Sequence, residues 1–282
     1  MSRLTSIGAS DAPKVVLGPQ FPTWAEKTGI AAPPDLDAVE AVQWGNILEG
    51  TIAATYAERT GRKVEHNANA AVTRHPELPF LTATLDAIQT DRERGIGALE
   101  VKNVGEYLLK DWEDGPPLRF QVQLQHQLAV TGMPWGTLCA LIGGNKLRHF
   151  DMARNERFIH WMIQRETEFW AMVVDRVPPE PDGSNATTDC VKLLYPNCTY
   201  KIVDLPAEAV GVDEELQVLK IDLKRRTQER QWLENKMKVW IGDASVGVLP
   251  NGVRYSWKQQ TAHHEAKAAY DSIYRVLRRK KG

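Results

Sequence analysis

Cysteine is scarce in this 282-residue chain: only Cys139, Cys190 and Cys198 occur, and no C-x-x-C pair is among them. The odd count and the spacing argue against a disulfide framework and a structural zinc site, and they are typical of a cytoplasmic protein with reduced thiols. No segment approaches the run of about 18 apolar residues that spans a membrane, and no signal-peptide pattern opens the sequence. We therefore expect a soluble, cytoplasmic protein with no membrane partner.

An excess of charge of either sign is also absent, because 35 Lys+Arg stand against 36 Asp+Glu, for a formal net charge of -1. This balance argues against a polybasic protein that coats nucleic acid through bulk charge, but it leaves room for a local basic groove. With 43% hydrophobic and 25% charged residues, the composition is that of a globular protein. At roughly 100 to 200 residues per domain, the length predicts one large domain, alone or with a smaller appendage.

Apolar periodicity predicts helices and strands along most of the chain. Spacings of three and four residues predict helices over residues 35–60, 118–130, 155–174 and 213–242. Apolar runs bounded by turn residues predict strands over residues 81–88, 96–102, 137–142 and 147–152, and a small hairpin within residues 246–257. Gly61 suits the end of the first helix.

Proline-rich segments indicate the boundaries of the main domain. Five prolines interrupt residues 1–34, so we expect mostly loop there, with a short helix after Ser10. Residues 178–184 form a second proline-rich stretch. We therefore predict a main domain over residues 1–177, followed by a linker and a C-terminal appendage over residues 178–282.

An acid and an amine share one face of the strand predicted at residues 96–102. Side chains alternate along a strand, so Glu100 and Lys102 point the same way while the residue between them faces the opposite layer. If the strand over residues 81–88 pairs with this one as a hairpin, Asp86 approaches the same face. Two carboxylates and an ammonium group then converge at one place.

This arrangement suits a hard divalent cation. Mg²⁺ prefers oxygen ligands and keeps water and substrate phosphate in its shell, so Asp86, Glu100 and the backbone carbonyl of Val101 are a typical protein contribution. Lys102 would orient or deprotonate the attacking water, or neutralise charge in the transition state, in a phosphodiester hydrolysis. Taken alone the pattern is weak evidence, because the same residues also occur by chance as a surface ion pair across a hairpin.

Four separated blocks carry a more specific pattern. They are residues 3–10 (RLTSIGAS), residues 44–49 (WGNILE), the LD of residues 85–86 with the EVK of residues 100–102, and the glutamine-rich residues 120–132 (FQVQLQHQLAVTG). In order and spacing, over about residues 1–177, these blocks resemble the bacteriophage lambda exonuclease and YqaJ viral recombinase family, part of the PD-(D/E)XK nuclease superfamily. Two positions depart from the family pattern: Ala87 stands where a glycine is usual, and Leu85 replaces the proline of the superfamily name. Neither departure removes a ligand.

The resemblance implies an α/β (α+β) fold with a central mixed β-sheet flanked by helices, that is, a restriction-endonuclease-like core. It also implies an enzyme that degrades the 5′-ended strand of linear duplex DNA, with Mg²⁺ as cofactor or Mn²⁺ in its place, as two ions when substrate is bound. The implied partners are double-stranded DNA ends, further copies of the chain in a trimeric ring, and a single-strand annealing protein. The implied origin is a phage or prophage in a bacterial cell.

The resemblance implies that Asp86, Glu100 and Val101 bind the metal. It also implies five catalytic residues: Glu49, Asp86, Glu100, Lys102 and Gln123. Gln123 would reach the active site and hold the attacking water or a phosphate oxygen, with Gln127 one helical turn along the same face. On the residues alone, Glu49 fits equally a surface acid on an amphipathic helix. The glutamine run likewise fits a solvated helix flank.

Three further positions match the family's pocket for a terminal 5′-phosphate: Arg3, Ser10 and Thr84. Arginine binds phosphate with two donors and hydroxyls add neutral donors, and Thr84 keeps the hydroxyl where a serine is common. Arg3 lies so near the start of the sequence that a solvated side chain is an open alternative.

Two other functions stay open at this point. The metal residues do not encode polarity, so a structure-specific or nicking endonuclease on the same core is the first alternative, and a catalytically inactive DNA-end clamp is the second. The appendage carries no catalytic pattern. Its end is basic, through Arg275, Arg278, Arg279, Lys280 and Lys281, and this end either contacts DNA or is a solvated tail.

Overall fold

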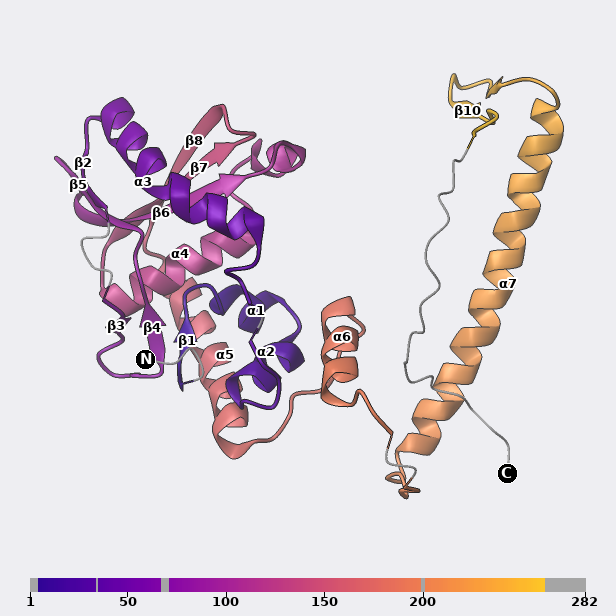
Figure 1. The fold of residues 1–282 in the computed structure, drawn as a ribbon, viewed down its shortest axis with the longest axis horizontal. Helices are drawn as coiled ribbons and strands as arrows, with labels where there is room; N and C mark the ends of the chain where they lie inside the picture. Colours follow the sequence, from indigo (N-terminus) through magenta and orange to yellow (C-terminus); the bar gives the residue numbers. More distant parts are fainter. Residues whose placement is uncertain (1–4, 34, 67–70, 199–200, 262–282) are drawn as a thin grey trace. The chain divides into compact units, whose positions relative to one another are not determined.

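The computed structural model describes residues 5–33, 35–66, 71–198 and 201–261. The chain divides into two compact units, Met1–Pro196 and Asn197–Gly282 (Figure 1). The first unit extends past residue 177, the predicted end of the main domain, because helix α6 (Asn185–Leu194) packs against helix α2 (Gln20–Lys27). Whether function divides at residue 177 stays a prediction.

A five-stranded mixed sheet forms the centre of the first unit. Its strands are β2 (Lys63–His66), β5 (Ala87–Asp91), β6 (Gly95–Val104), β7 (Trp135–Ile142) and β8 (Lys146–Ala153), in the order β2-β5-β6-β7-β8. The β6–β7 pair is parallel, and the other three pairs are antiparallel. The sheet confirms the predicted mixed α/β architecture and the predicted strands at residues 96–102, 137–142 and 147–152.

Helices cover both faces of this sheet (Figure 1). Helices α3 (Glu40–Thr60) and α4 (Leu118–Thr131) pack on the sheet, and α5 (Glu156–Asp175) packs against α4; all three lie close to the predicted bounds. Helix α3 ends at Gly61, whose φ of 68° lies in the left-handed region that glycine adopts without strain. Leu99 on β6 packs in one apolar cluster with α3, and its neighbour Ala98 packs in another with α4. This alternation fixes which residues of β6 face α4.

The segment predicted as one strand over residues 81–88 is two strands in different sheets, so its predicted pairing with residues 96–102 is wrong for the first half. Strand β4 (Leu81–Ala83) belongs to a separate three-stranded sheet with β1 (Ile7–Gly8) and β3 (Thr73–Arg74). The chain crosses from that sheet to the central one over residues 84–86, and only β5 forms the hairpin with β6, with Ala87 opposite Leu99. Both halves are apolar and β-like, so composition alone does not show the crossing.

The proline-rich N-terminal region is more helical than the loop that its composition predicts. The expected short helix is present as α1 (Ala12–Leu17), and α2 follows it directly. Pro13 and Pro22 both lie in the first turn of their helices, where a missing N–H group breaks no helical hydrogen bond. A further 3₁₀ helix, η2 (Glu106–Trp112), follows β6.

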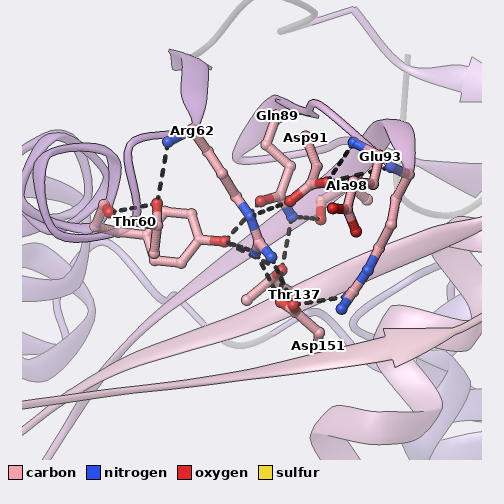
Figure 2. Close-up of polar contacts among 10 residues, drawn as sticks. Thr60, Arg62, Gln89, Asp91, Glu93, Ala98, Thr137 and Asp151 are labelled. Atoms are coloured by element: carbon pink, nitrogen blue, oxygen red, sulfur yellow. Dashed lines mark hydrogen bonds and ion pairs between the residues drawn. The ribbon is translucent and has the colours of Figure 1, made fainter.

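A polar cluster ties the end of α3 to the turn end of the β5–β6 hairpin (Figure 2). We call it the Arg62 cluster; it comprises Tyr56, Arg62, Gln89, Thr137 and Asp151. The Arg62 guanidinium donates through Nη1 and Nη2 to the two carboxylate oxygens of Asp151, at 2.8 and 2.7 Å. The Tyr56 hydroxyl donates to Gln89 Oε1 at 2.7 Å, and Gln89 Nε2 donates to Thr137 Oγ1 at 2.7 Å. The buried polar side chains of Gln89 and Thr137 are therefore paired within the cluster.

The second unit contains one long helix and a small hairpin. Helix α7 (Ala209–Ile241) precedes β9 (Val246–Val248) and β10 (Arg254–Ser256), an antiparallel pair, as the sequence predicts. The predicted basic end, residues 275–281, lies outside the described residues. In the described part of the chain, no helix combines the length and apolarity needed to cross a bilayer.

Candidate active site

The candidate site is centred on the carboxylate of Glu100, which strand β6 directs toward α4. Glu100 is 1% exposed although it carries a charge, and a buried carboxylate requires partners that compensate for its lost hydration. Lys102 Nζ lies 2.5 Å from Glu100 Oε1, so the two side chains share a face of the strand, as the alternation predicts.

Helix α4 supplies two amide donors to the same carboxylate. Gln123 Nε2 donates to Glu100 Oε1 at 2.5 Å, and Gln127 Nε2 donates to Glu100 Oε2 at 2.5 Å. Residues four apart lie on one face of a helix, so the two amides reach the strand together. The open alternative of a solvated helix flank is therefore excluded for Gln123 and for Gln127, which is fully buried.

Asp86 stands beside Glu100 at the start of β5. Continuing the hairpin register by one residue from Ala87 and Leu99 places it opposite Glu100. Its Oδ2 accepts a hydrogen bond from the Val101 backbone N–H at 2.8 Å, which holds the carboxylate at the end of the strand. Burial and the negative charge of Glu100 together raise the pKa of Asp86 to about 8. Two carboxylates thus meet where a cation is electrostatically favoured.

Lys102 supplies part of the compensating positive charge. Burial opposes its ionisation, but the adjacent Glu100 carboxylate outweighs burial and raises the pKa of Lys102 above its ordinary value. The side chain keeps 23% of its surface exposed, and Nζ lies 5.4 Å from the ring centroid of Phe120. An ammonium group in this position can both hold Glu100 and reach toward solvent.

Glu49 approaches the site from α3, and not from the strands. Its Oε1 lies 2.9 Å from Nε2 of His66, on β2, and its charge contributes to the raised pKa of Asp86. The side chain lines the same cavity as Asp86 and Glu100. Glu49 therefore lines the cavity with its side chain 25% exposed, and its catalytic role stays a prediction.

One cavity of about 850 Å³ brings together the residues predicted from separate parts of the sequence. Its lining includes Ser10, Glu49, Thr84, Asp86, Glu100, Val101, Lys102 and Gln123. Ser10 and Thr84 are exposed, as an anion pocket requires. Arg3, the third residue of the predicted phosphate pocket, lies outside the described residues. Three further cations, Lys14, Lys27 and Arg74, line the cavity, together with two further acids, Asp11 and Glu26, so the lining as a whole carries no positive excess.

An ion pair that the sequence did not suggest supports the Ser10 side of the cavity. Lys27 Nζ lies 2.6 Å from Asp11 Oδ2, and the Lys27 side chain is 1% exposed. The Gly8 backbone N–H donates to the same oxygen at 3.2 Å. Burial disfavours the charge on Asp11, but Lys27 outweighs burial and lowers the pKa of Asp11. Asp11 precedes α1 and Lys27 ends α2, 16 positions along the chain, so no local motif could have indicated the pair.

The donor set at Asp86 and Glu100 fits a hard divalent cation. Both carboxylates offer oxygen, and burial followed by repulsion from Glu100 raises the pKa of Asp86, so a cation bound there would favour its ionised form. Among the residues that the structure describes, no three His, Cys, Asp or Glu side chains lie close enough to hold a metal ion. A two-carboxylate site completed by the Val101 carbonyl therefore stays a prediction, as does the identity of the metal.

The fold and the site define a mixed α/β protein in which a lysine and two acids line one cavity. Comparison with known proteins refines this class. Residues 1–134 match the model of the YqaJ-like viral recombinase domain. The chain is 30% identical over 293 residues to the uncharacterized protein YqaJ of Bacillus subtilis (strain 168), covering 99% of this chain and 89% of that protein. The chain belongs to the YqaJ-like viral recombinase family, which confirms the resemblance.

Solved structures with a related fold include exonucleases. The alkaline exonuclease LHK-Exo from Laribacter hongkongensis matches with a TM-score of 0.49 and 18% identity over 62% of this chain and 90% of that one. A phage related exonuclease from Haemophilus somnus 129PT matches with a TM-score of 0.40 and 11% identity, over 61% and 96% of the two chains.

Proposed function

We propose that this protein is a divalent-metal-dependent exonuclease that degrades the 5′-ended strand of linear duplex DNA and leaves 3′ single-stranded overhangs. The observation that carries the proposal is the setting of Glu100. The carboxylate is buried beside Asp86 between an ammonium and two amides, in a cavity that also contains the hydroxyls of Ser10 and Thr84. Membership of a viral recombinase family supports a nuclease that acts in recombination.

The residues divide the chemistry among them. When bound at Asp86, Glu100 and the Val101 carbonyl, Mg²⁺ or Mn²⁺ supplies Lewis-acid stabilisation of a phosphodiester and of the attacking water, and two ions fit the proposal with substrate present. Lys102 offsets the negative charge that develops on the phosphate. Gln123 orients the attacking water or a phosphate oxygen, and Glu49 approaches the same centre from α3.

End recognition belongs to the other side of the cavity. Arg3, Ser10 and Thr84 bind a terminal 5′-phosphate, with the Asp11–Lys27 ion pair holding the loop that carries Ser10. A phosphate bound there would set the scissile bond against Asp86. The position of the hydroxyls in the same cavity as the acids supports this assignment.

The deciding experiment follows cleavage of end-labelled duplexes. Linear DNA with a 5′-phosphate, linear DNA with a 5′-hydroxyl and closed circular DNA are each incubated with Mg²⁺, Mn²⁺ or EDTA. We expect release of nucleotides from 5′ ends only, faster with phosphate, and none in EDTA. Cleavage of the circle would establish the endonuclease alternative, and binding without cleavage under every metal would establish the inactive clamp.

A pair of variants assigns the phosphate preference to the pocket. The double substitution Ser10→Ala and Thr84→Ala should reduce the preference for a 5′-phosphate while metal-dependent cleavage persists. Lys63→Ala is the matched control, because Lys63 lies on β2 outside the cavity with a side chain 74% exposed. An unchanged preference in the double variant would remove both hydroxyls from end recognition.

The remaining parts of the proposal concern partners and location. We propose a trimeric ring around DNA and delivery of the 3′ strand to a single-strand annealing protein in the cytoplasm of a bacterial host. These points rest on the resemblance of the four sequence blocks to the lambda exonuclease and YqaJ family. Sedimentation of the chain with and without duplex DNA tests the ring, and co-purification with an annealing protein expressed from the same phage-type operon tests the delivery.

A further inference from the structure

Helix α7 exposes an unusual amount of apolar surface for its length. It runs from Ala209 to Ile241 and none of its residues is buried. Leu219 and Leu223 are 57% and 68% exposed. Helices in proteins owe most of their stability to one packed face, and a helix of roughly 50 Å gains little from propensity alone. The exposed side chains therefore call for a partner.

The apolar residues of α7 follow a seven-residue repeat. Steps of four and three residues select nine positions, which we call the seam: Val212, Leu216, Leu219, Leu223, Arg226, Arg230, Leu233, Met237 and Trp240. Seven of these nine positions are apolar, against four of the twenty other positions between residues 212 and 240. A repeat of 3.5 residues sustained over four heptads is the pattern of a coiled coil.

The repeat also selects the kind of partner. A coiled-coil seam packs against a second helix whose apolar residues repeat with the same spacing. The α7 helix of a second copy of the chain has that spacing because its sequence is identical. Residues 212–240 carry seven basic and six acidic side chains, so the helix has neither the positive excess that nucleic acid requires nor a basic face for a lipid surface.

The two arginines in the seam already have acidic neighbours beside it. Arg226 Nε donates to Asp222 Oδ2 at 2.8 Å, and Arg230 Nε lies 3.4 Å from Glu234 Oε1. Asp222 and Glu234 occupy the positions that flank a seam, where charges set partner choice. Polar seam residues compensated in this way fix the register of a coiled coil at a cost in stability.

We propose that α7 is a self-association helix, which forms a coiled coil through this seam with α7 of a second copy of the chain. The proposal concerns the second unit alone and does not depend on the nuclease function. It assigns to the appendage a role that its lack of catalytic residues left open.

Two glutamate substitutions test the seam directly. Leu223 and Ile221 are almost equally exposed, at 68% and 70%, but only Leu223 belongs to the seam. Sedimentation of the full chain over a range of concentrations measures self-association. We expect Leu223→Glu to raise the dissociation constant by a factor of ~100 or more, because two buried leucines are lost per pair, and Ile221→Glu to leave it nearly unchanged.

A second variant changes the seam in the opposite direction. Replacing both Arg226 and Arg230 by leucine completes the apolar seam and should lower the dissociation constant. Circular dichroism of each variant establishes that it is folded, and cleavage of linear duplex on the same samples reports the proposed function separately. A wild-type chain that stays monomeric overturns the proposal. So does an equal effect of Leu223→Glu and Ile221→Glu, or no effect of either.

Discussion

The two ends of the β5–β6 hairpin carry polar clusters of opposite electrostatic character. At the turn end, the Arg62 cluster pairs each charge with an opposite one, and Arg62 itself contacts both oxygens of Asp151. At the other end, Asp86 and Glu100 bring like charges together, and the pKa of Asp86 rises to about 8. The first cluster is built for stability, whereas the second keeps a repulsion that a bound cation would relieve.

The largest expected effect is on the rate of DNA cleavage, at the end of the hairpin that carries Asp86 and Glu100. Lys102→Ala should lower the rate of duplex cleavage by a factor of ~10² to 10⁴, because it removes the ammonium group that offsets charge on the phosphate. Single-turnover cleavage of 5′-phosphorylated duplex measures the loss, and gel shift in EDTA measures binding, which should persist. Unchanged turnover would remove Lys102 from the mechanism.

At the turn end of the hairpin, where the Arg62 cluster lies, the expected effect is on stability. Arg62→Ala should lower the free energy of unfolding by about 2–4 kcal/mol, because it leaves Asp151 without its bidentate partner. Arg94→Ala is the matched control: Arg94 also donates to Asp151, at 2.8 Å, but its side chain is 50% exposed, and the expected loss is below about 1 kcal/mol. Urea unfolding measures both, and equal losses would contradict the comparison.

Removing the repulsion between Asp86 and Glu100 should stabilise the protein. Asp86→Asn keeps an oxygen to accept from the Val101 N–H and removes one of the two facing charges. In EDTA, at a pH above about 8 where Asp86 is ionised, we expect a gain of about 1 kcal/mol in the free energy of unfolding, together with loss of metal-dependent cleavage. Thermal unfolding with and without Mg²⁺ measures the gain. A destabilised variant would show that the two carboxylates do not repel each other.

The last effect is a pH dependence of stability at the end of the hairpin that carries the Arg62 cluster. Burial disfavours the charge on Asp151, but the hydrogen bond from Arg62 outweighs it and lowers the pKa of Asp151 from 3.8 to about 2. A depressed pKa contributes stability that is complete above the unfolded value and is lost as the pH falls from about 4 to about 2. Asp151→Asn should flatten the stability curve in that window, as urea unfolding at several pH values will show. An unaltered slope would contradict the assignment.

The parts of the site that sequence could predict depend on short-range periodicity. Alternation along a strand placed Glu100 and Lys102 on one face, and helical spacing placed Gln127 beside Gln123, because both rules act within a single element. The resemblance to a known family supplied Glu49, whose helix contributes to the site only through tertiary packing.

The parts that sequence could not predict depend on contacts between distant elements. The break after β4 is set by which sheet each half of an apolar segment joins, and the two halves look alike in composition. The Asp11–Lys27 pair joins two helices, one of which was expected to be loop because prolines in a first turn resemble prolines in a coil. Tertiary contacts, and not local secondary-structure propensities, decide both the break after β4 and the Asp11–Lys27 ion pair.

The crossing between the two sheets has a mechanical consequence. The crossing consists of residues 84–86, so Thr84 is its first residue and Asp86 its last. Strand β4 before it belongs to one sheet, and β5 after it belongs to the other. In the proposed function, the group that grips the strand terminus and the group that positions the bond to be cut are therefore separated by a single residue of anchored backbone. If both roles hold, this short backbone link would set the length of the released product by covalent geometry, without movement of a lid or domain.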